Sequence, residues 1–270
     1  MRCYYINLAR RTDRRAIMEQ RFAGLGLAHE RVEALTPAAI TPEQRKRYCN
    51  PAEHAWQSEG ELACSLSHLQ AMRQFLSSPA PYAAIFEDDA VLAPSLPALL
   101  EQFEQAAPQV DILRLETTNT RMRLLPRGDA QIGEFALHRM LSTGGAAAGY
   151  VMSRKGAERV LAGEEVLFDL TDQALFNPYA PIARDLTVRQ LVPALVVQED
   201  RLGQRADRIA NSDLESTRRH RDLIDKANFW RRAHYNFVDF VARDIALPLR
   251  NVWLRLTLGA AKRDVPFKAE

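Results

Sequence analysis

One short segment of this 270-residue chain constrains its fold more than any other: the apolar run 82–86 leads directly into three consecutive acids, Glu87, Asp88 and Asp89. A continuous apolar run of this length is typical of a strand buried on both faces of an α/β sheet, and ligands bind beyond the carboxyl ends of such strands. Three adjacent carboxylates repel one another unless a cation lies between them. The pattern therefore indicates a site for a divalent metal and a phosphate group. An acidic surface turn is the alternative interpretation.

The composition fits a globular protein and excludes some classes. Hydrophobic residues make up 47% and charged residues 26% of the chain, enough for one large domain or one domain with an appendage. A net charge of only +2 argues against a dedicated nucleic-acid binder. Cys3, Cys49 and Cys64 include no Cys-x2-Cys pair, which favours reduced thiols in the cytoplasm over a disulfide framework or a zinc site. Without a run of 18 apolar residues, we expect no membrane span.

Strand-like and helix-like segments alternate through the first two-thirds of the chain, which predicts an α/β fold with a mostly parallel central sheet. The expected strands are 3–8, 31–34, 82–86, 111–115, 150–153, 188–192 and 194–197. Capping boxes at 41–44 and 58–61 mark two helix starts, and we expect Thr12 and Ser153 to cap two more helices. A further helix is expected to begin at Ser95 and to end near Ala107. The polar stretch 117–133 is expected to be irregular.

The chain changes character near residue 215, which divides it into an expected catalytic domain, 1–215, and a helical extension, 216–270. From residue 218 onward twelve Lys and Arg face six Asp and Glu, a local net charge of +6. Apolar residues at helical spacing follow over 223–241, and Leu249, Val252, Trp253 and Leu256 form a second apolar face. Two interpretations stay open: residues 218–270 contact an anionic membrane surface, or they pack on the domain with a solvated basic face.

Four arginines lie where the first expected strand turns into the first helix. Asn7 ends that strand, and Arg10, Arg11, Arg14 and Arg15 follow. Guanidinium groups match phosphate geometry and helix N-termini attract anions, so this segment is a candidate site for a nucleotide diphosphate. The sequence holds neither a GxGxxG fingerprint nor a P-loop. The alternative is that these arginines only face solvent.

Two further polar groups are candidates for a pocket. Glu61, Ser65 and His68 share one stripe of an otherwise apolar helix. Either they line a pocket, or they are satisfied within the protein, with Glu61 closing the capping box. Asp172 lies in the polar segment 169–173 that follows an apolar run, and an aspartate there can serve as a general base. Helix capping is an adequate alternative for that segment.

Six blocks, in this order, resemble glycosyltransferase family 25. They are INLARRTDRR, GELACSLSHLQA, AAIFEDDAVL, GGAAAGYVMSRKGAERVL, DLTDQALF and PALVVQED, and they fall within about residues 2–200. This is the lipooligosaccharide galactosyltransferase family of Gram-negative bacteria, which also contains relatives of collagen galactosyltransferase domains. Residues beyond 215 match the family only in general character.

The resemblance implies a GT-A-like nucleotide-sugar-binding fold and an inverting transfer, usually of galactose from UDP-galactose, to a lipopolysaccharide or lipooligosaccharide acceptor. It implies that the acidic run holds Mn²⁺ (or Mg²⁺) against the donor diphosphate, with Asp88 and Asp89 as metal ligands. Glu87 and Asp172 are the implied catalytic residues, with Asp172 as the base. The implied donor-binding residues are Asn7, Arg10, Arg11, Arg14, Glu61, Ser65 and His68.

Two other classes stay open, a metal-dependent phosphohydrolase and a non-catalytic sugar-nucleotide-binding protein. A dehalogenase-type hydrolase needs its aspartate at the end of the first strand, where this chain has Asn7 and Leu8. The run 144–149 is unusually small and apolar for the family, so glycosyl transfer is a firmer expectation than galactose. We expect the protein in the cytoplasm, at the inner face of the bacterial inner membrane if the extension binds lipid.

Overall fold

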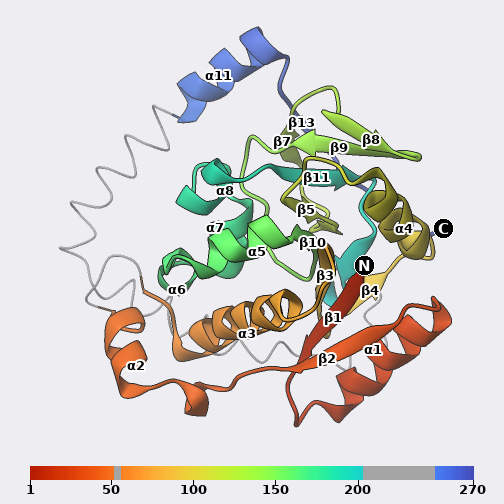
Figure 1. Ribbon diagram of the computed structural model, residues 1–270. Coiled ribbons are helices and arrows are strands. Elements are labelled where there is room, and N and C mark those ends of the chain that lie inside the picture. Colours follow the sequence, from red (N-terminus) through yellow and green to blue (C-terminus); the bar gives the residue numbers. More distant parts are fainter. Residues whose placement is uncertain (52–55, 203–246) are drawn as a thin grey trace.

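The computed structural model describes residues 1–51, 56–202 and 247–270, and its centre is an eight-stranded sheet (Figure 1). The strand order is β2-β1-β3-β10-β5-β11-β9-β8. The strands are β1 (Arg2–Asn7), β2 (His29–Glu33), β3 (Tyr82–Glu87), β5 (Ile112–Arg114), β8 (Ala130–Ile132), β9 (Phe135–Arg139), β10 (Gly149–Ser153) and β11 (Val188–Val192). The predicted α/β fold is confirmed.

The sheet is mixed. Six strands run in one direction, whereas β9 and β10 run in the other, so most strands are parallel, as expected. Most neighbouring pairs are nevertheless antiparallel, because only β1–β2, β1–β3 and β5–β11 are parallel neighbours. The strand β10 is the cause, because it lies between β3 and β5 and pairs with both in the antiparallel sense.

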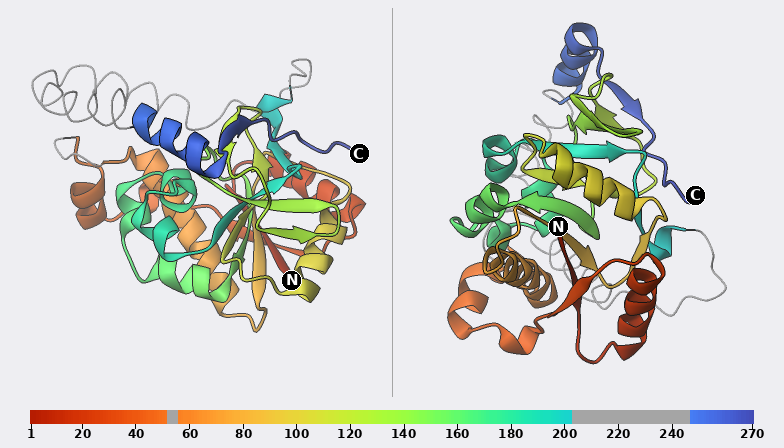
Figure 2. Two further views of the ribbon diagram at one scale, coloured as in Figure 1. Left: turned by 90° about the horizontal axis from the view of Figure 1, so that it is seen from above. Right: turned by 45° about the vertical axis from the view of Figure 1, so that its right-hand side comes forward.

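Helices cover both faces of the sheet (Figures 1 and 2). They are α1 (Thr12–Gly24) and α4 (Leu96–Ala106) on one face, and α3 (Glu59–Leu76), α5 (Arg154–Leu161), α6 (Glu165–Phe168), α7 (Thr171–Phe176) and α8 (Pro181–Asp185) on the other. Alternate residues of the inner strands face the two layers, as the two-residue period of a strand requires. Tyr4 and Ile85 pack with the α3 layer, whereas Tyr5 and Phe86 pack with the α1 layer.

Local sequence signals explain most of the helix starts. The two predicted capping boxes are present, with Thr41 capping α2 (Pro42–Tyr48) and Ser58 capping α3, and the Ser153 side chain accepts a hydrogen bond from the backbone N–H of Gly156. The expected cap at Thr12 is wrong, because Thr12 is already inside α1. The helix expected from Ser95 to about Ala107 is confirmed as α4, with Ser95 at the N-cap position, although its side chain makes no capping hydrogen bond.

The polar stretch 117–133 contains strands that the sequence did not predict. Two smaller sheets have the orders β4-β12-β6 and β13-β7. Their strands are β4 (Ala90–Leu92), β6 (Glu116–Thr117), β7 (Met122–Leu124), β12 (Val196–Gln198) and β13 (Ala261–Arg263); short 3-10 helices occupy Pro37–Ala39 and Glu199–Arg201. The expectation of irregular structure over 117–133 is therefore wrong for β7 and β8. Strands of two or three residues are too short to show an alternating pattern.

The helix α11 (Leu247–Leu258) displays the apolar face that the sequence predicted. Leu249, Val252, Trp253 and Leu256 are 55–79% exposed. The opposite side holds the helix in place, because Leu254 packs against Leu141 and Ala260.

The last residues of the chain return to the body of the fold. The strand β13 pairs with β7, the carbonyl of Val265 accepts a hydrogen bond from Thr117, and the backbone of Ala194 bonds to Pro266 and Lys268. The expected boundary at residue 215 and the helix over 223–241 lie outside the described residues. Within the part of the chain that the structure describes, none of the helices is long and apolar enough to cross a bilayer.

The two capping boxes form a natural pair for a stability test, because one is buried and the other is exposed. Thr41→Ala should lower the free energy of unfolding by about 1 kcal/mol, the usual value for a lost N-cap. Ser58→Ala should lower it by about 2 kcal/mol, since the Ser58 hydroxyl also donates a hydrogen bond to the buried carboxylate of Glu61. Equilibrium urea unfolding measures both values. An equal or smaller loss for Ser58→Ala would contradict this account.

Candidate active site

A cavity of about 260 Å³ opens at the carboxyl end of β3. Its walls come from the first half of α3, the start of α7, the loop before β10 and the segment after β12. The lining residues are Glu61, Cys64, Ser65, Glu87, Gly145, Ala146, Ala147, Leu170, Thr171, Asp172, Gln198 and Arg201. Four predicted site residues, Glu61, Ser65, Glu87 and Asp172, thus meet around one cavity although they are distant in sequence.

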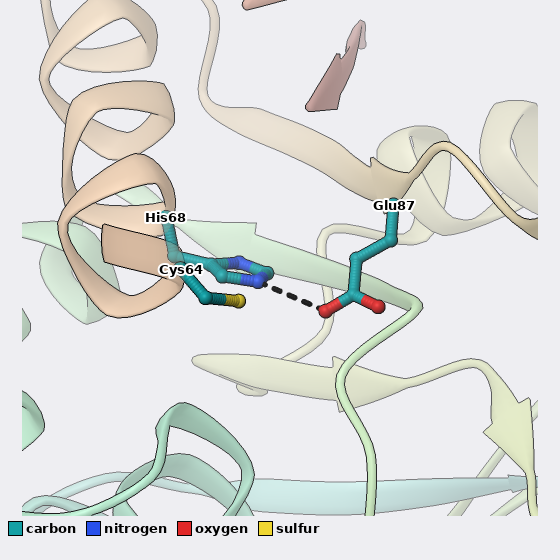
Figure 3. A group of neighbouring side chains, drawn as sticks. All are labelled: Cys64, His68 and Glu87. Atoms are coloured by element: carbon teal, nitrogen blue, oxygen red, sulfur yellow. Dashed lines mark hydrogen bonds and ion pairs between the residues drawn. The ribbon is translucent and has the colours of Figure 1, made fainter. Parts of the chain in front are cut away.

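Glu87 faces the cavity and is held from behind by His68. The His68 Nε2 atom lies 3.2 Å from Glu87 Oε1 (Figure 3), and the His68 Nδ1 atom lies 3.0 Å from the hydroxyl of Tyr150. Because a carboxylate only accepts hydrogen bonds, Nε2 carries the proton in this arrangement and Nδ1 accepts from Tyr150. His68, a predicted donor-binding residue, is fully buried and so acts on the cavity through Glu87.

Asp88 is not among the described residues that line the cavity, and it joins two segments of the fold. Its Oδ2 atom accepts a hydrogen bond from Asn7 Nδ2 at 2.8 Å, and its Oδ1 atom accepts one from Arg14 Nη1 at 2.7 Å. Burial raises the pKa of Asp88, an effect that Arg14 and Asn7 oppose. The predicted donor residues Asn7 and Arg14 are therefore engaged by a protein carboxylate. Neither is among the described residues that line the cavity.

The other two N-terminal donor candidates also lie outside the cavity wall. Arg11 forms an ion pair with Asp13 at 2.8 Å, beside the start of α1. Arg10 is exposed and is not among the lining residues that the structure describes. Their predicted contact with a nucleotide remains a prediction.

Asp89 is also not among the described residues that line the cavity, but of the three acids its environment best fits a cation. Its Oδ1 atom is buried without a hydrogen-bond partner among the described residues, and its Oδ2 atom is 3.7 Å from Arg14 Nη1. Burial, and then the negative charge of Glu87, raises the pKa of Asp89 to about 7. A buried oxygen without a donor is costly, and a hard divalent cation with carboxylate ligands would satisfy it. Glu87 and Asp89 thus suit a metal better than Asp88, whose two oxygens are already engaged.

The two other cavity residues from α3 have internal partners. Glu61 Oε2 accepts from the backbone N–H and the hydroxyl of Ser58, at 2.9 and 2.7 Å. The Ser65 hydroxyl donates to Gln57 at 3.0 Å and accepts from Thr171 at 3.2 Å. Both sequence interpretations thus apply together: these side chains are satisfied internally and still line the cavity.

Asp172 fastens the loop that forms the opposite wall. Its Oδ2 atom accepts a hydrogen bond from the backbone N–H of Ala146 at 2.7 Å, and its Oδ1 atom accepts from the N–H of Gln173 at 2.8 Å. The carboxylate also borders the cavity. Asp172 therefore positions the loop and borders the cavity at the same time.

A buried pair that the sequence analysis missed holds the same loop from below. Arg114 donates to the carbonyl of Gly145, and Glu116 accepts from the N–H of Ala148 at 2.7 Å. The two side chains are 4.0 Å apart and almost fully buried. Burial raises the pKa of Glu116 to about 8, an effect that Arg114 opposes. The available signal was the presence of two charged residues inside an otherwise apolar run.

The glycines of this loop differ in the space around them. A methyl group at Gly149 would lie 2.8 Å from both methyl carbons of Val196, so this position is closed. One at Gly144 would lie 2.9 Å from the terminal methyl of Met140, a flexible side chain that can move aside. At Gly145 the nearest atom would be Asp172 Oδ2 at 3.9 Å. The close packing of the loop thus depends most on its last glycine.

Comparison with known proteins decides the family. The family model "Glycosyltransferase family 25 (LPS biosynthesis protein)" matches residues 1–169. This chain belongs to glycosyltransferase family 25. The resemblance seen in the sequence is confirmed, and family membership favours glycosyl transfer over the phosphohydrolase alternative.

Relatives of this family 25 glycosyltransferase match over most of their length. The lacto-N-neotetraose biosynthesis glycosyltransferase LgtB of Neisseria gonorrhoeae is 29% identical, covering 87% of each chain. The lipooligosaccharide biosynthesis protein lic2B of Haemophilus influenzae is 28% identical, covering 98% of each chain. The solved structure of a glycosyltransferase involved in glycosylation of the major capsid of PBCV-1 has a TM-score of 0.42 at 9% identity, covering 82% of this chain and 98% of that one.

The buried Glu116 should give this family 25 enzyme a characteristic pH dependence. The pKa of Glu116 is about 8 in the folded chain against 4.5 for the free group. Between these values the folded state holds a proton that the unfolded state has lost, so this carboxyl lowers stability as pH rises. Glu116→Gln removes the titration. From about pH 5 to about pH 8 wild type should therefore lose stability relative to the variant, by about 1 kcal/mol or more.

Urea unfolding of both proteins across this pH range measures the difference. The comparison is of slopes, so it tolerates a constant loss from leaving Arg114 without its charged partner. A difference between the two proteins that stays constant with pH, or moves in favour of wild type, would contradict the raised pKa.

Proposed function

We propose that this glycosyltransferase moves a sugar, galactose in the first instance, from a UDP-sugar to a lipopolysaccharide or lipooligosaccharide glycan, with inversion and with a divalent metal. The observation that carries the proposal is the acidic end of β3. Glu87 borders a cavity there, and Asp89 has a buried oxygen without a donor. The names of LgtB and lic2B, which refer to lacto-N-neotetraose and lipooligosaccharide biosynthesis, support this acceptor class.

We assign the metal to Glu87 and Asp89. In the sequence interpretation Asp88 and Asp89 were the ligands, but both oxygens of Asp88 accept hydrogen bonds from Asn7 and Arg14. Carboxylate oxygens are the ligands that Mn²⁺ and Mg²⁺ prefer. When bound, such an ion would neutralise negative charge on the diphosphate of the departing UDP. Asp88 then has a positioning role, because it fixes the β1–α1 junction beside the two ligands.

The cavity wall supplies the groups that would hold the two substrates. Arg201 contributes a cationic side chain that suits the donor diphosphate, and Gln198 orients it with a 3.3 Å contact to Arg201 Nε. The small residues 145–147 leave room for a sugar ring. Arg10 and Arg11 remain proposed contacts to the nucleotide; they follow β1, the strand that runs parallel beside β3.

The reaction that this arrangement supports is a single in-line displacement. An oxygen of the acceptor hydroxyl forms a bond to the anomeric carbon while the bond from that carbon to the UDP oxygen breaks, and UDP leaves with the electron pair. Asp172 accepts the hydroxyl proton. Its hydrogen bond from the N–H of Ala146 keeps the carboxylate directed at the cavity wall.

The decisive experiment combines the metal assignment with the reaction class. Asp89→Ala removes one of the two proposed ligands, so Mn²⁺-dependent transfer from UDP-galactose to a lipooligosaccharide acceptor should fall by about a hundredfold or more. Glu101→Ala, which removes an exposed acid of α4 that is not among the cavity-lining residues, is the control and should keep full activity. The rate of UDP release is measured with and without acceptor, and circular dichroism checks the fold.

Three outcomes would overturn the proposal. Near wild-type transfer by Asp89→Ala would remove the metal assignment. UDP-sugar cleavage at the same rate with and without acceptor would favour the phosphohydrolase alternative, and no turnover with any UDP-sugar and glycan would favour a binding protein.

We also propose that α11 contacts the anionic inner face of the bacterial inner membrane. Its exposed face carries Trp253 and three aliphatic residues, and Arg255 and Arg263 add exposed positive charge nearby. Apolar and basic residues together favour anionic lipid over a neutral surface. The enzyme would then meet a lipid-linked acceptor at the membrane surface that anchors the acceptor.

Vesicle co-sedimentation tests this contact. The enzyme should sediment with vesicles of phosphatidylcholine and phosphatidylglycerol more than with phosphatidylcholine alone, and Trp253→Ala with Leu256→Ala should lower the bound fraction severalfold. Leu202→Ala, at an exposed leucine on another segment, is the control. Equal sedimentation of the double variant and wild type would refute the role of α11.

A further inference from the structure

Three side chains beside the cavity form a group whose chemistry the proposed reaction does not use in full. Cys64 and His68 are four residues apart on α3, so they lie on the same side of the helix. Glu87 reaches them from the end of β3 (Figure 3). One ligand atom from each residue lies within 4.8 Å of the others. The sequence shows the first two as neighbours, but only the fold adds the third.

The distances suit a tetrahedral metal site. Zinc bonds of about 2.0 Å to nitrogen or oxygen and about 2.3 Å to sulfur put tetrahedral ligand atoms roughly 3.3–3.8 Å apart. His68 Nε2 and Glu87 Oε1 are already 3.2 Å apart. The sulfur has to approach the other two atoms by no more than about 1.5 Å, which a χ1 adjustment of Cys64 can supply.

The donor atoms select the class of metal. Thiolate and imidazole are ligands of zinc, cobalt and similar borderline or soft cations, whereas magnesium, calcium and manganese prefer oxygen. A site with one sulfur, one nitrogen and one carboxylate oxygen therefore differs from the oxygen-only pair Glu87 and Asp89. Glu87 belongs to both groups, so the two cations would compete for its carboxylate.

The surroundings of His68 match those of a metal-binding histidine. Such a residue usually bonds through its second ring nitrogen to a neighbouring group, which fixes the ring. Here Nδ1 lies 3.0 Å from the hydroxyl of Tyr150, and the two rings stack with centroids 5.9 Å apart. With Nε2 on a metal, the ring proton moves to Nδ1 and is donated to the Tyr150 oxygen. Tyr150 can make this contact in either direction, because a phenol both donates and accepts.

The position of the group leaves one coordination site open. Cys64 and Glu87 line the cavity, whereas His68 lies behind them. Three protein ligands with an open fourth position are typical of zinc sites that hold water or an external ligand. The other two cysteines lack this setting: Cys3 is buried in the core, and burial raises the pKa of Cys49 to about 11.

We propose that Cys64, His68 and Glu87 bind one thiophilic divalent cation of the zinc class, with the fourth ligand taken from solvent in the cavity. The absence of a Cys-x2-Cys pair made the sequence argue against a zinc site. The structure replaces that pair with a Cys-x3-His pair on one helix and a carboxylate from a strand end. This inference does not rest on the proposed function, because it concerns only the three ligands.

Cobalt substitution tests the proposal without an activity assay. The purified full-length protein is treated with a chelator, dialysed and titrated with Co²⁺. Wild type should develop a sulfur-to-cobalt charge-transfer band in the near ultraviolet that saturates at one equivalent, and added Zn²⁺ should abolish the band. Cys64→Ser should show no such band, whereas Cys49→Ser, the matched control, should behave as wild type.

A second variant separates the ligands. Glu87→Gln keeps the thiol and should keep the band, but with affinity about tenfold lower or weaker, since a metal loses a charged ligand. Circular dichroism confirms that each variant is folded, and Cys64→Ala replaces Cys64→Ser if the serine protein does not fold. A wild type without the band, a band that persists in Cys64→Ser, or one that disappears in Cys49→Ser would overturn the proposal.

Discussion

The structure depends on how three consecutive carboxylates are accommodated at one strand end. Each has a different solution: His68 and Gln198 contact Glu87, Asn7 and Arg14 engage Asp88, and Asp89 keeps one oxygen without a donor. The partners come from α3, β12, β1 and α1, so the electrostatic demand of this short run determines which segments must meet. The cavity lies beside that meeting point, with Glu87 and Gln198 in its wall.

The parts of this arrangement that are local in sequence could be predicted. The apolar run of β3 and both capping boxes depend on residues within a few positions of one another, and the structure has them as expected. The partners of Asp88 are 74 and 81 residues away, and nothing local shows that an arginine at a helix start will bind a carboxylate and not a nucleotide. The strands β6, β7 and β8 are recognised only by their pairing with other strands, because two or three residues are too few to show an alternating apolar and polar pattern.

Charged residues inside apolar segments hold part of the cavity wall in place. Arg114 and Glu116 lie in or beside a buried strand, yet their side chains hold the loop that forms one wall of the cavity. Asp172 reaches that loop from the other side. Together these three side chains bond the peptide group between Gly145 and Ala146 and the N–H of Ala148, so the loop is held from both sides. Cys64 is a comparable case, because its place in the proposed metal site becomes visible only when the fold brings Glu87 beside it.

The unequal crowding around the loop glycines limits where the cavity can change shape. At residue 149 any side chain would collide with the branched side chain of Val196, so the architecture admits only glycine there. Residue 145 tolerates a methyl group that would project toward Asp172. One substitution at residue 145 could thus narrow the cavity while the packing around residue 149 stays intact.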